Sequence, residues 1–176
     1  MKKLRVDVEE VANMMQSSSY FGYDFSAFLD TETGEIYFFT EDSVPSEVRG
    51  CEIEEEELPK ILEKAYEWQV DFIKKAYEIY CEDENERYVG IPPSSSRYAY
   101  KRMRDFVLKI EDEELRERVY ELIQGKGAFS RFKTFLGLHR EYLDQWKDYE
   151  EKFRKEEAAE WLNSIGIDPI DTPSSE

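Results

Sequence analysis

The chain has 176 residues, a formal net charge of −17 at pH 7, and 37% charged and 15% aromatic residues. A chain of this length can bury about 70% of the surface that its unfolded state exposes, so a core is expected, and the aromatic content excludes disorder. The negative charge argues against nucleic acid or an anionic membrane as a partner of the whole molecule, because like charges repel at long range.

The first predicted element is a short amphipathic helix over Val8–Gln16. Asp7 stands at the position of an N-cap residue, and the apolar side chains after it recur at helical spacing. Ser17–Ser19 are expected to end this helix.

A β-hairpin is predicted next. Tyr23–Asp30 alternates in polarity as a strand does, and Glu35–Thr40 is rich in β-branched and aromatic residues. The residues between them have turn chemistry, with Gly34 free to adopt a positive φ.

The turn also contains a partial calcium-loop pattern, since Asp30, Glu32 and Glu41 occupy positions 1, 3 and 12 of such a loop. The glycine falls at position 5 instead of 6, and strands flank the loop instead of helices. A solvated turn is therefore the preferred interpretation, and no metal site is predicted.

Residues 41–50 read as a loop, and the acidic run Glu52–Glu57 after it is interpreted as the entry to a helix. From Leu58 to Tyr80 the apolar spacing predicts one long helix with a proline in its first turn. Arg87–Pro93 then predicts a short strand ended by two prolines, which would join the hairpin in a three-stranded sheet.

The C-terminal half is expected to be wholly helical. Its predicted helices run from the serines at 94–96 to Ile110, from Asp112 to Ile123, from Gly127 to Leu136, and from His139 to Trp161. Gly125 and Gly137 mark breaks between them.

These elements predict an α+β fold with a small antiparallel sheet packed by helices. A single domain is expected over residues 1–166, in which 1–93 holds the sheet and the long helix and 94–166 is the helical half. Residues 167–176 are expected to form a tail.

Acidic and basic residues are segregated along the chain. Residues 97–140 contain 11 Lys and Arg and 7 Asp and Glu, a balance of +4, whereas the remainder holds 13 basic and 34 acidic residues, a balance of −21. The helical half is therefore where a surface for an acidic partner is expected.

The first candidate binding site is the helix corner that contains Lys126, Gly127, Arg131 and Lys133. Neither the Walker A motif nor the dinucleotide-binding fingerprint fits this segment, but free N–H groups at the start of a helix, joined by three cations, favour an anion or a partner's carboxylate. The alternative is a purely architectural corner whose cations pair internally.

The second candidate site is the helix face that carries Arg97, Lys101 and Arg104 at i, i+4 and i+7. With Tyr98 and Tyr100 nearby, such a face is suited to a nucleic-acid backbone or to stacking on bases. A solvated helix face is the preferred interpretation of these cations, and internal pairing with the acidic run at 52–57 is a further alternative.

No catalytic constellation is recognised. His139 is the only histidine, no Ser or Cys has an evident partner for it, and a capping or half-buried role is favoured. A zinc site would lack any close-spaced ligand pair. Asp24, Asp30 and Glu35 are the carboxylates of a disfavoured alternative, a hydrolase. No cofactor is predicted.

Cys51 and Cys81 are the only cysteines, and no run approaches the ~18 apolar residues that a membrane span needs. Acidic residues interrupt any secretory signal pattern near residues 7–10. Two reduced thiols and a cytoplasmic location are therefore expected, with no membrane partner.

Several segments together resemble an uncharacterised family of small acidic bacterial proteins. They are Leu29-Asp30, Thr33-Gly34-Glu35, Arg87 to Pro92, Met103 to Phe106, Gly125 to Lys133, Trp146 and Glu160-Trp161-Leu162. The resemblance covers most of the chain and is centred on the Gly-Lys-Gly-Ala-Phe-Ser-Arg-Phe-Lys segment. It implies a bacterial cytoplasmic protein and carries no activity, cofactor or catalytic residue.

The expected function is a non-enzymatic binding or regulatory module that presents its basic corner to an acidic protein partner. A nucleic-acid-associated factor that contacts phosphates through both basic sets is the alternative.

Overall fold

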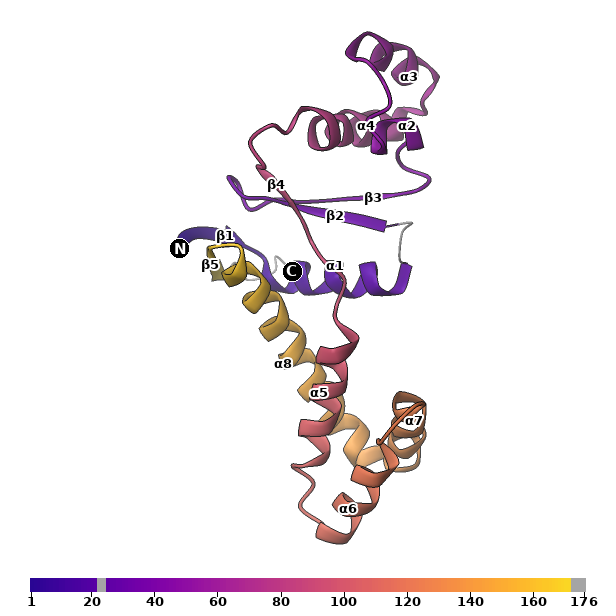
Figure 1. The fold of residues 1–176 in the computed structure, drawn as a ribbon, viewed down its shortest axis with the longest axis vertical. Coiled ribbons are helices and arrows are strands. Elements are labelled where there is room, and N and C mark those ends of the chain that lie inside the picture. Colours follow the sequence, from indigo (N-terminus) through magenta and orange to yellow (C-terminus); the bar gives the residue numbers. More distant parts are fainter. Residues whose placement is uncertain (22–24, 172–176) are drawn as a thin grey trace. The chain divides into compact units, whose positions relative to one another are not determined.

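The computed structural model describes residues 1–21 and 25–171, and it confirms an α+β fold (Figure 1). The elements in chain order are β1 (Lys2–Val6), α1 (Val8–Phe21), β2 (Phe25–Asp30), β3 (Ile36–Thr40), α2 (Ser46–Arg49), η2 (Glu55–Glu57), α3 (Leu58–Lys64), η3 (Glu67–Gln69), α4 (Val70–Tyr77), η4 (Glu78–Glu82), β4 (Tyr88–Gly90), α5 (Ser96–Val107), α6 (Glu113–Leu122), α7 (Ala128–Leu138), α8 (Arg140–Ser164) and β5 (Ile167–Asp171).

The chain forms two compact units. Unit 1 comprises residues 1–93 and 161–176, and unit 2 comprises residues 94–160. Unit 2 contains 15 Lys and Arg and 15 Asp and Glu, a net charge of zero, whereas unit 1 contains 9 and 26, a net charge of −17. The whole net charge of the chain therefore resides in unit 1.

Unit 1 is built on an antiparallel sheet with the strand order β3-β2-β4. The β2–β3 hairpin pairs Phe25 with Thr40 and Leu29 with Ile36, and β4 adds to the other side of β2. This confirms the predicted hairpin and third strand, although the start of the first predicted strand, Tyr23 and Asp24, lies outside the described residues. β3 is left as an edge strand.

Helices lie on both faces of this sheet, with α1 on one side and α2 and α4 on the other (Figure 1). Residues opposite one another in a hairpin share a face, so Phe28 and Tyr37 face α4, and Phe39 on the same face packs into a core with Ile73 of α4. Leu29, on the other face, is fully buried.

A second, parallel pair of strands joins β1 to β5, with Lys2 opposite Ile167 and Val6 opposite Asp171. Sequence reasoning missed this pair, and the expectation of a tail from residue 167 is wrong for β5. The residues of β1 alternate between exposed and buried, with Leu4 and Val6 buried. Its partner strand lies 165 residues away in the sequence and contains Pro169, which sequence reasoning interprets as the end of a helix and not as part of a strand.

α1 begins as predicted, because the Asp7 carboxylate accepts a hydrogen bond from the Glu10 N–H at 3.0 Å. It does not end at the serines, however, and continues to Phe21. Serine lowers helix propensity by only a few tenths of a kcal/mol relative to good helix formers, so three serines weaken a helix without breaking it.

The single helix predicted from Leu58 to Tyr80 is wrong, because the backbone is extended at Ala65 and Tyr66. Gln69 stabilises this break: its side chain accepts from the Tyr66 N–H at 3.0 Å and donates to the Asp42 carbonyl at 2.9 Å. α3 therefore ends at this break, and α4 begins after it. The spacing of apolar residues cannot predict the contact between Gln69 and Asp42.

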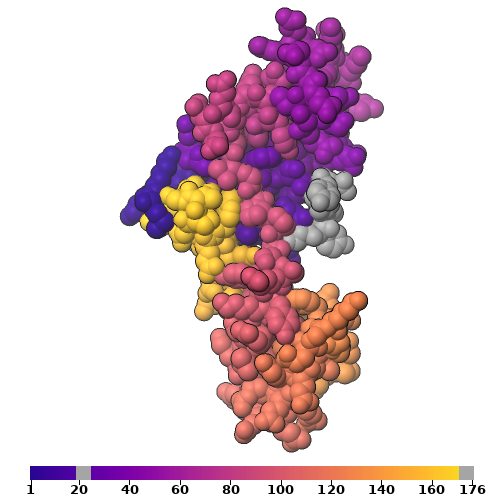
Figure 2. Space-filling model, in the orientation of Figure 1, coloured from indigo at the N-terminus to yellow at the C-terminus, as the bar shows by residue number. Residues whose placement is uncertain are grey.

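Unit 2 is a four-helix assembly, and α5 to α7 form one continuous body in the space-filling view (Figure 2). Its core contains Phe106 of α5, Phe132 of α7 and Trp146 of α8, whose rings lie 4.9–6.1 Å apart. The helix expected from Asp112 is confirmed as α6, and Asp112 caps it by accepting from the Leu115 N–H at 3.0 Å. The predicted break at Gly137 is displaced to His139, since α7 continues through Leu138.

Cys51 and Cys81 form a disulfide within unit 1, so the expectation of reduced thiols is wrong. The two residues are 30 positions apart in the sequence, but the turn after α2 places the Cα atom of Cys51 5.4 Å from the Cα atom of Cys81 in η4. That distance lies within the range that disulfides require.

Candidate binding surfaces

The two basic sets predicted from the sequence meet in unit 2 through a pair of aromatic rings. Tyr100 of α5 packs edge-on against Phe129 of α7 with 6.4 Å between ring centroids, and its hydroxyl donates to the Ile123 carbonyl at 3.3 Å. Arg97 and Arg104 lie one turn before and after Tyr100 on α5. Lys133 lies one turn after Phe129 on α7.

We call this the basic–aromatic surface and define it as Arg97, Lys101, Lys126, Phe129 and Lys133. All five are exposed, and Phe129 has 44% of its surface accessible to solvent. Within the described part of the chain, the four cations form no ion pair or hydrogen bond through their side chains. They are therefore available to an anionic partner.

Arg104 and Arg131 differ from these four cations. Arg104 lies 3.7 Å from the Asp105 carboxylate, a weak surface pair. Arg131 donates through Nε to the Leu122 carbonyl at 2.6 Å, through Nη1 to Lys126 at 2.8 Å and through Nη2 to Gln124 at 2.6 Å. Its guanidinium thereby satisfies carbonyls at and beyond the end of α6.

Gly127 explains why the corner contains glycine. Its φ is +84°, a left-handed conformation, and a Cβ added there would lie 3.0 Å from Nη1 of Arg131. The residue is thus the N-cap of α7 and leaves room for the arginine that caps α6. Its role lies in the shape of the corner.

Arg102 and Glu157 form a buried link in unit 2 that the sequence did not reveal. The Arg102 guanidinium lies 3.5 Å from the Glu157 carboxylate, which also accepts from the Ser94 hydroxyl at 2.7 Å and the Ser95 N–H at 3.1 Å. A carboxylate from α8 therefore occupies the N-terminus of α5, where the helix dipole favours negative charge.

Of the carboxylates considered for a hydrolase, Asp30 and Glu35 make structural contacts, and Asp24 lies outside the described residues. Asp30 is 0% exposed, and Arg87 binds it with Nε–Oδ1 at 2.9 Å and Nη2–Oδ2 at 2.5 Å. Burial acts to raise the pKa of Asp30, but the bonds from Arg87 and from the Glu32 and Thr33 N–H groups outweigh it and lower the pKa to about 2. Such a carboxylate is a weak base and no proton donor at neutral pH. The turn itself is exposed at Glu32 and Thr33, as expected, whereas Asp30 at its start is buried in an ion pair.

His139 has the capping role that the sequence indicated. It is half-buried at the end of α7, its ring stacks on Phe135 at 4.5 Å, and its Nδ1 lies 3.0 Å from the Phe135 carbonyl. That geometry fits a tautomer in which Nδ1 carries the proton and donates it to the carbonyl.

Metal ligands do not gather in groups of three or more among residues 1–21 and 25–171. None of the helices described has the length and apolar character needed to span a bilayer.

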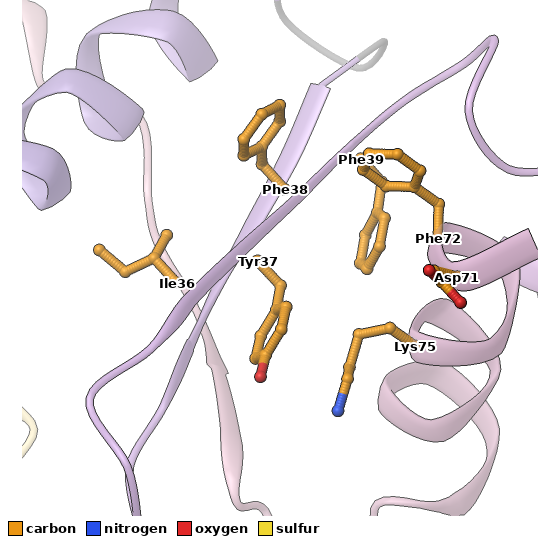
Figure 3. A pocket seen from close by; sticks show the side chains of 7 residues that line it. All are labelled: Ile36, Tyr37, Phe38, Phe39, Asp71, Phe72 and Lys75. Atoms are coloured by element: carbon orange, nitrogen blue, oxygen red, sulfur yellow. The ribbon is translucent and has the colours of Figure 1, made fainter. Parts of the chain in front are cut away.

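A second surface lies in unit 1 and was not predicted. A pocket of about 280 Å³ follows the outer edge of β3 and is bounded on its other side by α4 (Figure 3). Its lining residues are Ile36, Tyr37, Phe38, Phe39, Asp71, Phe72 and Lys75. We call it the β3-edge groove. Phe38 and Phe72 are 43% and 37% exposed at its mouth.

A polar network closes one end of the β3-edge groove. Lys75 lies 4.8 Å above the Tyr37 ring and donates to Glu78 at 2.7 Å. The bond from Lys75, followed by the one from the Tyr88 hydroxyl, lowers the pKa of Glu78. A hydrogen bond to Glu35, together with burial, raises the pKa of Tyr37 to about 12. Near pH 7 Tyr37 therefore keeps its proton and Glu78 stays ionised, so neither group is suited to proton transfer.

The fold and these surfaces define an α+β protein with a neutral helical unit, an acidic sheet-containing unit, and exposed aromatic side chains on each. The chain belongs to the uncharacterised protein family UPF0158, whose family model matches residues 61–174. It is also similar to UPF0158 protein PA5073 of Pseudomonas aeruginosa, with 30% identity over 88 residues. That match covers 50% of this chain and 58% of the relative. No solved structure matches the chain.

Proposed function

We propose that the protein is a non-enzymatic binding module whose basic–aromatic surface recognises an acidic segment of a partner protein. The observation that carries the proposal is an exposed phenylalanine, Phe129, set among four exposed cations that have no partner among the described residues. Aromatic anchors ringed by charge are typical of binding surfaces, because the ring supplies buried area and the charges supply specificity.

Charge distribution supports the choice of unit 2 for this role. Its net charge is zero, so an acidic segment meets less repulsion at unit 2 than at unit 1. Arg131 and Gly127 stabilise the turn between α6 and α7. Lys126 lies in this turn, three residues before Phe129 in the sequence.

The proposal is tested by fluorescence anisotropy with two labelled probes, an Asp/Glu-rich peptide that contains one Leu and a single-stranded oligothymidylate. We expect the full chain to bind the peptide, and the double variant Lys126→Glu, Lys133→Glu to bind it at least about tenfold more weakly. The matched control reverses two exposed lysines of α8, Lys147→Glu and Lys152→Glu, and should bind as the wild type does.

Tight binding of the oligonucleotide instead, with a salt dependence that falls by about one unit of slope for each cation removed, would assign the surface to nucleic acid. Equal behaviour of the two double variants, or binding of neither probe, would refute a binding role for this surface.

The cytoplasmic location expected from the sequence is also part of the proposal, and the Cys51–Cys81 disulfide argues against it. Trapping Cys51 and Cys81 with an alkylating reagent in intact cells tests it, because disulfides are rare in a reducing cytosol. A fully oxidised pair in vivo would place the protein elsewhere.

A further inference from the structure

The outer edge of β3 has hydrogen-bonding groups directed away from the sheet. The Asp30 N–H donates to the Glu35 carbonyl at 2.9 Å, and antiparallel pairing alternates from residue to residue, so Ile36 and Phe38 direct their N–H and C=O groups outward. The same groups of Thr40 bond Ser43. Within the described residues, β3 pairs with β2 alone.

This edge lacks the features that protect exposed strands. Natural edge strands carry lysine, proline or a bulge, whereas β3 reads Ile-Tyr-Phe-Phe-Thr and pairs with β2 in an unbroken register. Phe38 is 43% exposed at its centre. An uncovered aromatic edge of this kind is typical of a surface that a further strand completes.

The β3-edge groove supplies pockets for the side chains of such a strand. Side chains of an added strand alternate between the two faces of the sheet. On the α4 side they would enter between Tyr37 or Phe39 and Phe72, and on the other side they would contact Ile36 and Phe38 (Figure 3). The α4 side is enclosed by Phe72 and fits an apolar residue at every second position, whereas the other side, at the exposed Phe38, leaves the alternate positions facing solvent.

The negative charge of unit 1 indicates which kind of strand would bind at the β3 edge. Unit 1 has 9 basic and 26 acidic residues, and Asp71 lies at the groove itself. A second copy of the chain would bring two units of charge −17 edge to edge, which long-range repulsion opposes. A strand with Lys or Arg at its solvent-facing positions would be attracted instead.

We infer that the β3 edge and its groove bind an extended segment of a partner protein by strand addition, with apolar residues alternating with Lys or Arg. The backbone of Ile36 and Phe38 pairs with the segment, Phe72 and Tyr37 hold its apolar side chains, and the acidic surface of unit 1 attracts its cations. This site is separate from the basic–aromatic surface of unit 2 and does not depend on it.

The test uses the full chain and a labelled octapeptide of alternating Lys and Val. We expect binding, and at least about tenfold weaker binding of the matching Glu and Val peptide, with both peptides measured on the full-length Lys126→Glu, Lys133→Glu variant so that the basic–aromatic surface does not bind the acidic one. Phe38→Pro removes one outward N–H without touching the bonds to β2, and Phe72→Ala removes a groove wall; each should weaken binding about tenfold. Tyr120→Ala, an aromatic of similar exposure in unit 2, is the matched control and should have no effect.

Hydrogen exchange separates strand addition from general charge attraction. On binding, amide exchange at Ile36 and Phe38 should slow, since both N–H groups gain acceptors. Binding that persists unchanged in Phe38→Pro and Phe72→Ala, or that leaves these two amides exchanging as before, overturns the inference. So does a concentration-dependent dimer that Phe38→Pro abolishes, because the edge would then belong to a second copy.

Discussion

The buried pair of Asp30 and Arg87 makes the most direct prediction about stability. Asp30 ends β2 and accepts the Glu32 and Thr33 N–H groups of the hairpin turn, while Arg87, just before β4, binds the same carboxylate. One ion pair thus connects the turn of the hairpin to the third strand. Arg87→Met leaves the carboxylate buried with only its hydrogen bonds from Glu32 and Thr33.

Removal of one partner of a buried pair costs about 3–5 kcal/mol. Because Arg87 is itself 34% exposed and Asp30 retains two backbone hydrogen bonds, we expect the lower end, about 3 kcal/mol, in urea denaturation at pH 7. The double variant Asp30→Asn, Arg87→Met should be more stable than Arg87→Met alone, because it no longer buries an unpaired charge. Arg118→Met, at an exposed pair with Glu114, is the control and should change stability by less than about 0.5 kcal/mol.

The effect of Arg87→Met should also depend on pH. The pKa of Asp30 is about 2 in the folded protein, below the value of about 3.9 of an unfolded chain. A lowered folded pKa contributes stability that is fully present above about pH 4 and is lost as the pH falls toward 2. The difference between wild type and Arg87→Met should therefore narrow over that range. A difference independent of pH, or a double variant no more stable than the single one, would refute the reasoning.

Three further changes should alter the urea-denaturation midpoint by different mechanisms. Arg131→Lys loses the forked contact with three carbonyls and should cost about 1–3 kcal/mol, whereas Lys133→Met should be nearly neutral; equal effects would show that Arg131 is not a cap. Gly34→Ala should lower stability far more than Gly125→Ala. Both glycines have a positive φ, which costs an L-residue about 1–2 kcal/mol. Only at Gly34 would the added Cβ also clash with a backbone oxygen, that of Arg5, at 1.9 Å. Cys51→Ser should cost roughly 3–4 kcal/mol for a 30-residue loop, and reductant should bring the wild type to the same midpoint; a reductant-insensitive wild type would contradict the disulfide.

Local chemistry was a sound guide wherever the interactions are close in sequence. The alternation around Phe28, the caps at Asp7 and Asp112, and the glycine turn before α7 all act within a few residues, so the hairpin and most helix starts were predicted. The α+β class followed from these elements. The two basic sets were proposed from residue type and spacing, which did not reveal that Arg131 binds the carbonyls at the end of α6.

The features that could not be predicted from the sequence all depend on contacts between residues that are far apart in the chain. The parallel pairing of β1 with β5, the Gln69 contact to Asp42 that breaks the long helix, and the Cys51–Cys81 disulfide all join segments without a shared local pattern. The same is true of the β3-edge groove. The apolar run Ile36–Phe39 signals a strand, but only the sheet order shows that the strand is an edge.

The pairing of β1 with β5 means that unit 1 is discontinuous in the sequence, with unit 2 encoded between its two parts. During translation, residues 2–6 must therefore wait for residues 167–171 before they acquire a pairing partner, whereas every residue of unit 2 has already been made. A released chain truncated soon after residue 160 should thus hold every residue of the helical unit, while its incomplete sheet unit leaves Leu4 and Val6 without a strand partner and open to chaperones.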